Sequence, residues 1–110
     1  MIEAIVIKYL NDKLSVPVFM EMPEEKVTSF VMVERTGGAT ENHINYATFA
    51  IQSYAETLEK TILLNEEVKN AMDNIIELDS VFRSKRNSDY NFTDTIKKRY
   101  RYQAVYDLVY

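Results

Sequence analysis

The sequence contains no cysteine and only one histidine among its 110 residues. Without cysteine the chain cannot form a disulfide, a thiolate metal site or a thiol nucleophile, which fits a reducing compartment. The single histidine, His43, excludes a histidine cluster for a metal ion, and a serine triad would depend on that one side chain. The only glycines, Gly37 and Gly38, lack the lysine and glycine spacings of a P-loop or a dinucleotide fingerprint. These absences predict that the protein is not an enzyme and holds no metal or cofactor.

The N-terminal segment also lacks the pattern of a targeting or membrane segment. Residues 1–8 place Glu3 before Lys8 and contain no long apolar run, so we expect neither a signal peptide nor a membrane span. No stretch of the chain resembles a linker, so residues 1–110 should form a single domain with a modest core of its own. We therefore expect a soluble protein that is intracellular when made and has no membrane partner.

Charge is distributed unevenly along the chain. The net charge is −4, but residues 1–80 carry 6 basic and 14 acidic side chains, whereas residues 81–110 carry 7 basic and 3 acidic ones. Such asymmetry is typical of a nucleic-acid patch, or of identical subunits that pack acidic surface against basic surface.

Two apolar stretches, residues 30–33 and 47–51, flank one long polar connection and predict a hairpin. The second stretch alternates with the period of two that a half-buried strand requires. About ten polar residues exceed what a tight turn needs, so we expect a long, mobile loop at the tip, which is either functional or without consequence. We expect the loop to contact a partner protein or a neighbouring subunit. Its candidate contact residues are Thr36, Gly37, Gly38, Thr40, Glu41, Asn42 and His43.

Apolar residues at helical spacing predict two helices. The first should cover residues 2–13, and the second should run from a capping box of Ser53 and Glu56 to about residue 76, although its cap can lie a residue or two later. Each helix has one apolar face, so both are expected to pack on the same side of a sheet.

Three further strands complete the expected sheet. Residues 16–20 indicate a short edge strand because Pro17 lacks a backbone donor, and alternation predicts strands over residues 81–92 and 96–110 with a turn at residues 93–95. The order of elements predicts an α+β domain: an antiparallel or mixed sheet with two helices on one face and a long hairpin loop.

The last two strands hold most of the basic side chains. Basic strands with interleaved aromatics bind single-stranded nucleic acid in many sheet proteins, so a small nucleic-acid-binding sheet protein is the alternative interpretation. The aromatics alternate with the basic residues, however, which favours a core beneath a charged surface. The basic residues expected to form an inter-subunit or partner face are Arg83, Lys85, Arg86, Lys97, Lys98, Arg99 and Arg101.

Three segments carry a resemblance to a known family. They read FVMVERTGG at residues 30–38 with ENHI at 41–44, AIQSYA at 50–55, and NSDYNFTD at 87–94 followed by KRYRYQ at 98–103. Over nearly the whole chain, the sequence resembles the small tail terminator, or head-tail joining, proteins of long-tailed bacteriophages, commonly met as prophage genes in Gram-positive bacteria. The resemblance assigns no individual binding residue.

The resemblance implies an α+β subunit that assembles as a ring, a hexamer, on the end of the growing tail tube. There it would stop tube polymerisation and join the tail to the head. The implied partners are other copies of the chain, the tail tube protein and a head-completion or connector protein, with DNA passing through the ring. The implied location is the virion tail, after assembly in the host cytoplasm.

Overall fold

A five-stranded sheet in the order β1-β2-β3-β5-β4 organises the chain. The computed structural model describes all residues, 1–110, and confirms the expected α+β class. The sheet is mixed, because β1 runs parallel to β2 while the other neighbours are antiparallel. In chain order the elements are α1 (Ile2–Lys13), β1 (Val18–Phe19), β2 (Phe30–Glu41), β3 (Ile44–Tyr54), α2 (Leu58–Asp73), the 3-10 helix η1 (Ile75–Glu77), β4 (Arg83–Asn91) and β5 (Arg101–Val109).

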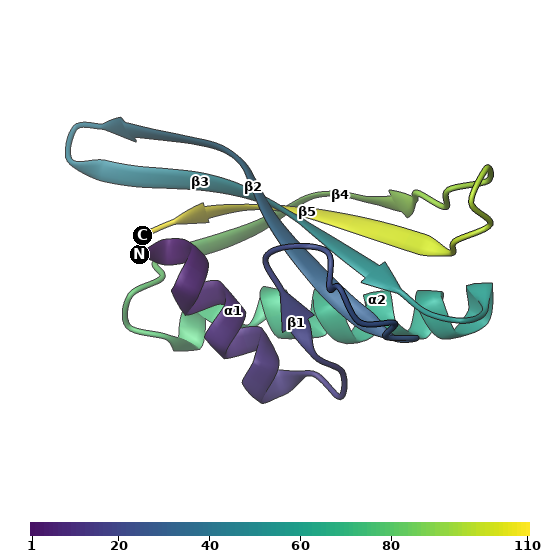
Figure 1. Ribbon diagram of the computed structural model, residues 1–110. Coiled ribbons are helices and arrows are strands. Elements are labelled where there is room, and N and C mark those ends of the chain that lie inside the picture. Colours follow the sequence, from purple (N-terminus) through teal and green to yellow (C-terminus); the bar gives the residue numbers. More distant parts are fainter.

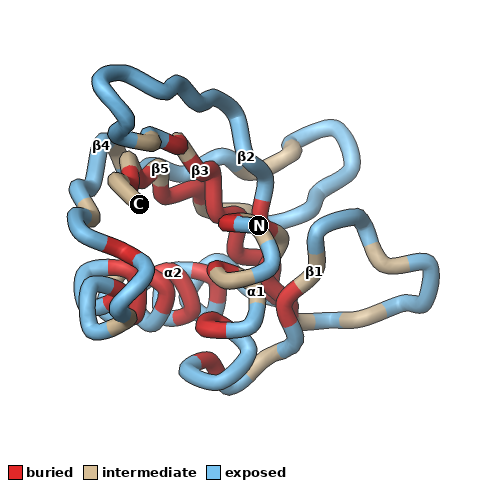
Figure 2. Tube along the Cα trace, turned by 90° about the vertical axis from the view of Figure 1, so that its left-hand side faces the viewer, coloured by how far each residue is buried: buried red, intermediate tan, exposed pale blue.

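Both helices pack on the same face of the sheet (Figure 1), as the apolar stripes predict. The 20 buried residues of the main core form a layer between that face and the helices (Figure 2). Phe49, at the centre of this layer, is fully buried. Replacing such an aromatic core residue by alanine typically costs about 3–5 kcal/mol. The layer includes Val6 and Leu10 of α1, Val68 and Met72 of α2, and Val33, Phe49, Ile51, Tyr106 and Leu108 of the strands.

Side-chain alternation divides the sheet into a helix face and an open face, which neither helix covers. Polar side chains on the open face hydrogen-bond across the strands. Gln52 Nε2 donates to Gln103 Oε1 at 2.8 Å, and Gln103 Nε2 donates in turn to the Tyr90 hydroxyl. Thr48 Oγ1 donates to Asp107 Oδ1 at 2.7 Å. The middle of the open face is therefore hydrogen-bonded and polar, whereas Phe30 and Tyr54 are buried at the end of this face away from the hairpin turn.

The hairpin of β2 and β3 is confirmed, but the expected long loop at its tip is wrong. The strands continue to the pairs Thr40–Asn45 and Glu41–Ile44, and only Asn42 and His43 form the turn. These two residues have φ values of 50° and 66°, the left-handed region that two-residue hairpin turns require. The sequence misleads here because the strand ends are exposed and polar, so they carry no hydrophobic alternation.

Other element boundaries also differ from those expected. Ser53 is not a helix cap: it is a buried residue of β3, and α2 begins after Thr57, whose Oγ1 accepts from the Lys60 N–H at 3.1 Å. Helix α2 ends at Asp73, and the short η1 follows it. The last two strands are shorter than expected, and residues 92–100 form a loop between them. β1 lies at the sheet edge, as Pro17 indicated.

Candidate functional site

Residues 34–46 form the far part of the β2–β3 hairpin, which we call the hairpin arm. Beyond the pair of Ala39 and Tyr46 the arm extends past the end of β5 and projects from the body of the domain (Figure 1). Every β2 residue from Glu34 to Glu41 is exposed. Ile44 and Tyr46 on β3 are also exposed, at 43% and 38%. The arm thus exposes backbone groups, polar side chains and the apolar side chains of Ile44 and Tyr46, none of which is buried in the core of the domain.

All seven candidate contact residues lie in this arm. The structure places Thr36 at a β-bulge between Arg35 and Gly37, so the ladder is locally interrupted there. Asn42 and His43 form the turn. The other four lie along β2, so the seven residues line an exposed strand instead of gathering in a compact loop: Gly37, Gly38, Thr40 and Glu41.

Gly38 leaves room for Arg35, a role that the sequence did not suggest. Neither glycine has a positive φ, so turn formation is not their function. The Arg35 guanidinium lies where a Cβ on Gly38 would be, and its Nε donates to Gly37 O at 3.2 Å. From there Arg35 Nη1 reaches Glu3 Oε1 of α1 at 3.6 Å. This contact connects the base of the arm to the first helix.

The basic residues do not form one continuous face. Arg83 and Lys85 extend from the open face of β4 at the hairpin end of the sheet, where they are paired with Val109 and Asp107 of β5. Arg86 lies on the helix face, and its Nη2 forms an ion pair with Asp73 Oδ2 at 3.0 Å. The remaining four residues belong to the opposite end of β4 and β5: Lys97, Lys98, Arg99 and Arg101.

Arg99 and Arg101 pack against aromatic rings within the subunit. Phe30 and Tyr54 stack on the open face with their ring centres 4.5 Å apart, and the Arg99 guanidinium carbon lies 5.2 Å from the centre of the Tyr54 ring. Arg101 lies 4.1 Å from the centre of the Phe92 ring, and its Nη1 donates to the Tyr54 hydroxyl at 3.2 Å. Cation–π contacts of this kind stabilise the aromatic cluster and use the guanidinium groups that a phosphate site would need.

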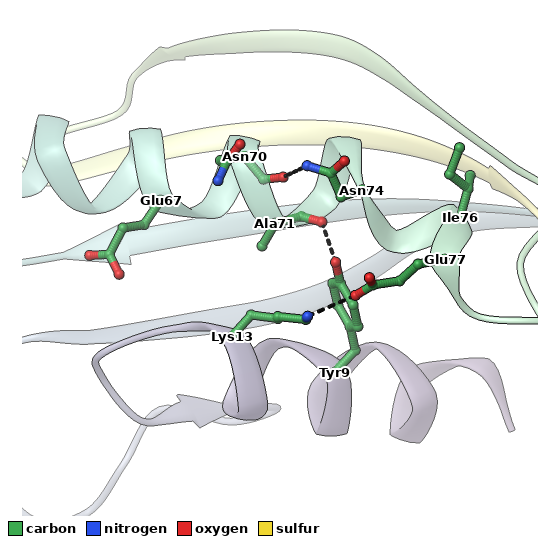
Figure 3. A pocket seen from close by; sticks show the side chains of 8 residues that line it. All are labelled: Tyr9, Lys13, Glu67, Asn70, Ala71, Asn74, Ile76 and Glu77. Atoms are coloured by element: carbon green, nitrogen blue, oxygen red, sulfur yellow. Dashed lines mark hydrogen bonds and ion pairs between the residues drawn. The ribbon is translucent and has the colours of Figure 1, made fainter.

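A groove of about 680 Å³ lies between α1 and the C-terminal part of α2 (Figure 3). Tyr9 points across it from α1, and its hydroxyl donates to Ala71 O at 2.8 Å. Beside this ring, Lys13 Nζ and Glu77 Oε1 form an ion pair at 2.8 Å. Burial and then the Glu77 carboxylate raise the pKa of Tyr9 to about 12, so the hydroxyl remains a donor at neutral pH. These contacts connect α1 to α2 and to η1, and no sequence pattern predicted them.

No group of three or more histidine, cysteine, aspartate or glutamate side chains is arranged to hold a metal ion. Neither helix has the combined length and apolar character of a membrane-crossing segment. No protein-family model and no curated protein matches the sequence.

Proposed function

We propose that this chain is a structural protein of a bacteriophage or prophage tail. Copies of it would form a ring on the end of the tail tube, terminate tube polymerisation and join the tail to the head. The resemblance to tail terminator proteins suggests this assignment; it is carried by residues 30–38 with 41–44, residues 50–55, and residues 87–94 followed by 98–103. The geometry adds a surface suited to assembly.

The observation that carries the proposal is the hairpin arm. Eight successive β2 residues, from Glu34 to Glu41, are exposed, yet all except Thr36, at the bulge, are paired with β3. An ordered strand pair that projects from a domain offers backbone groups to another chain at a small entropic cost, because it is already fixed before contact. Such a feature suits a subunit that acts by binding its neighbours.

We do not propose nucleic-acid binding as the function. The basic residues are divided between two ends and two faces of the sheet, and Arg86, Arg99 and Arg101 already have partners within the chain. A single-strand site would instead combine a continuous basic groove with accessible aromatic faces.

The test is to shorten the hairpin arm. Residues 40–45 are replaced by Asn-Gly, so that the hairpin closes on the existing pair of Ala39 and Tyr46. The removed side chains are largely exposed, and one backbone hydrogen bond from Tyr110 N to Asn45 O is lost. The free energy of unfolding should fall by only about 1 kcal/mol. Tails should be overlong or unjoined to heads when the variant replaces the natural subunit.

His43→Gly is the matched control, because it changes the turn but keeps the length of the arm. Electron microscopy of particles made in producing cells should then show normal tails. Tails of normal length joined to heads in the shortened variant would count against the proposed function.

A further inference from the structure

Two strand edges of the sheet have no neighbour. β4 is the last strand in the sheet order, and its only partner is β5. At the other side, β1 pairs only with Val31 and Met32, which leaves residues 33–41 of β2 without a partner on their outer side. The free part of β2 contains as many residues as the whole of β4, which has nine. Unpaired edges offer a row of backbone donors and acceptors to another chain.

The two edges run in opposite directions. β2 is antiparallel to β3, β3 to β5, and β5 to β4, so β2 and β4 are antiparallel to each other across the sheet. A second copy in the same orientation, placed with its β2 beside β4, would therefore extend the sheet by an ordinary antiparallel pair. Contacts of this head-to-tail type use two different surfaces and generate a ring when the rotation closes.

The two edges also carry opposite charge on the open face. Glu34 and Glu41 lie on the β2 edge, whereas Arg83 and Lys85 lie on the β4 edge. None of these four side chains forms an ion pair within the chain. Pairing β4 with another β4 would bring like charges together, and so would pairing β2 with β2. Charge therefore favours the unlike pair.

The arginines on the helix face do not oppose this pairing. Arg35 on β2 and Arg86 on β4 have their charge balanced within the subunit by Glu3 and Asp73, respectively. Their side chains are therefore already engaged when the edges meet.

We propose that the free edge of β2 in one copy pairs with β4 of the next copy, and that this contact builds the ring. The inference rests on the proposed function and names its subunit interface. The regular segments on the hairpin side of the two bulges, residues 37–41 and residues 83–86, form the pair. The bulges at Thr36 and Asn87 and the basic side chains of β4 disfavour edge pairing between dilute molecules. The contact therefore forms at high local concentration, such as on a tail end.

Engineered disulfides test the pairing directly, because the natural chain has no cysteine. Through the strand register, Gly37 lies level with Lys85, and both face the open side. A Cβ on Gly37 has space, with its nearest neighbour at 3.9 Å. Gly37→Cys, Ala39→Cys or Glu41→Cys is combined with Lys85→Cys, so that three registers two residues apart are sampled.

Concentrated protein is oxidised and separated without reductant. At least one double variant should give a ladder of dimers, trimers and larger species, while each single variant should remain largely monomeric. A dimer from Lys85→Cys alone that accounts for all the cross-linked product would overturn the inference, because it would mean that β4 pairs with itself. The absence of a ladder in all three double variants would overturn it as well.

Charge exchange provides a second test that needs no cross-link. Glu41→Lys and Lys85→Glu should each weaken association at low salt by about tenfold or more, and the two changes in one chain should restore it. Lys98→Glu, at the opposite end of the sheet, is the matched control and should have little effect. Sedimentation velocity at high protein concentration measures all four variants. Failure of the double variant to regain association would contradict the proposed pair.

The outcomes separate this interface from the proposed function. Rings seen on tail ends without any cross-linking would remove the edge contact and leave the tail function standing. A clear ladder from a chain whose absence from producing cells leaves tails of normal length joined to heads would instead remove the tail function and leave the edge contact standing.

Discussion

A small polar network connects α2 to the edge strand β4. Lys69 Nζ lies 2.7 Å from Asp89 Oδ2, and Asn65 Nδ2 donates to the other carboxylate oxygen at 2.6 Å. The Lys69 side chain is only 12% exposed, so its charge depends on these partners. Burial acts to raise the pKa of Asp89, but the hydrogen bonds from Lys69 and Asn65 outweigh it and hold the pKa below its ordinary value.

Asp89→Asn should lower the free energy of unfolding at neutral pH by about 1–2 kcal/mol, because a charge-assisted hydrogen bond to a partly buried lysine is lost. The native pKa of Asp89 lies below its unfolded value, so this contribution is complete above about pH 4 and disappears as the pH falls through the lowered pKa. Urea unfolding of both proteins from pH 7 to pH 2 measures the difference.

Glu66→Gln is the control for that network. Glu66 contacts the same ammonium at 2.7 Å, but its side chain is 61% exposed. Exposed pairs of this kind contribute about 0–1 kcal/mol, so the effect should be smaller than that of Asp89→Asn. Equal effects of the two substitutions, or a difference that persists at pH 2, would contradict the account of the network.

At the scale of elements, the start of α2 shows what sequence patterns resolve. The spacing of Ser53 and Glu56 matches a capping box. In the structure, however, β3 continues through Ser53, which is buried between its paired residues, Val31 of β2 and Tyr102 of β5. Thr57 then supplies the cap. Apolar periodicity located both helices because each has a core-facing stripe, but it did not define their ends, which depend on local hydrogen bonds.

Thr57→Ala should destabilise the domain by about 1 kcal/mol, the usual cost of losing a side-chain cap. Ser53→Ala should be neutral or slightly stabilising, because Ser53 Oγ is buried and makes no hydrogen bond. Thermal unfolding of the two variants compares the sites directly. A larger loss from Ser53→Ala than from Thr57→Ala would contradict the position of the cap.

At the scale of the whole molecule, the sequence predicted the layers but not the surfaces. The apolar stripes of residues 2–13 and the alternation of residues 47–51 determine which faces are buried, so the α+β arrangement followed from them. The relation of the two free edges depends on strand order, which is set by contacts between distant residues and left no local pattern. The basic residues were grouped from their sequence positions, whereas a strand nearly 30 Å long separates their two ends.

We expect the isolated chain to be a monomer or a weak oligomer in dilute solution, because both helices cover the same sheet face and the free edges carry bulges and charge. Raising the salt concentration should weaken association further, since screening reduces attraction between exposed charges. Sedimentation over a range of protein and salt concentrations measures this. A tight dimer under all conditions would argue against it.

The two-residue turn at Asn42 and His43 also determines how the reach of the arm could vary among related proteins. Antiparallel pairs alternate between two geometries, so the same turn type can close only on every second pair. Shortening or lengthening the hairpin without changing the turn therefore adds or removes two pairs at a time, a step of about 7 Å. The distance that the arm spans between neighbouring subunits would consequently change only in steps of this size. Each step is large enough to exclude a partner whose binding surface fits an arm of a different length.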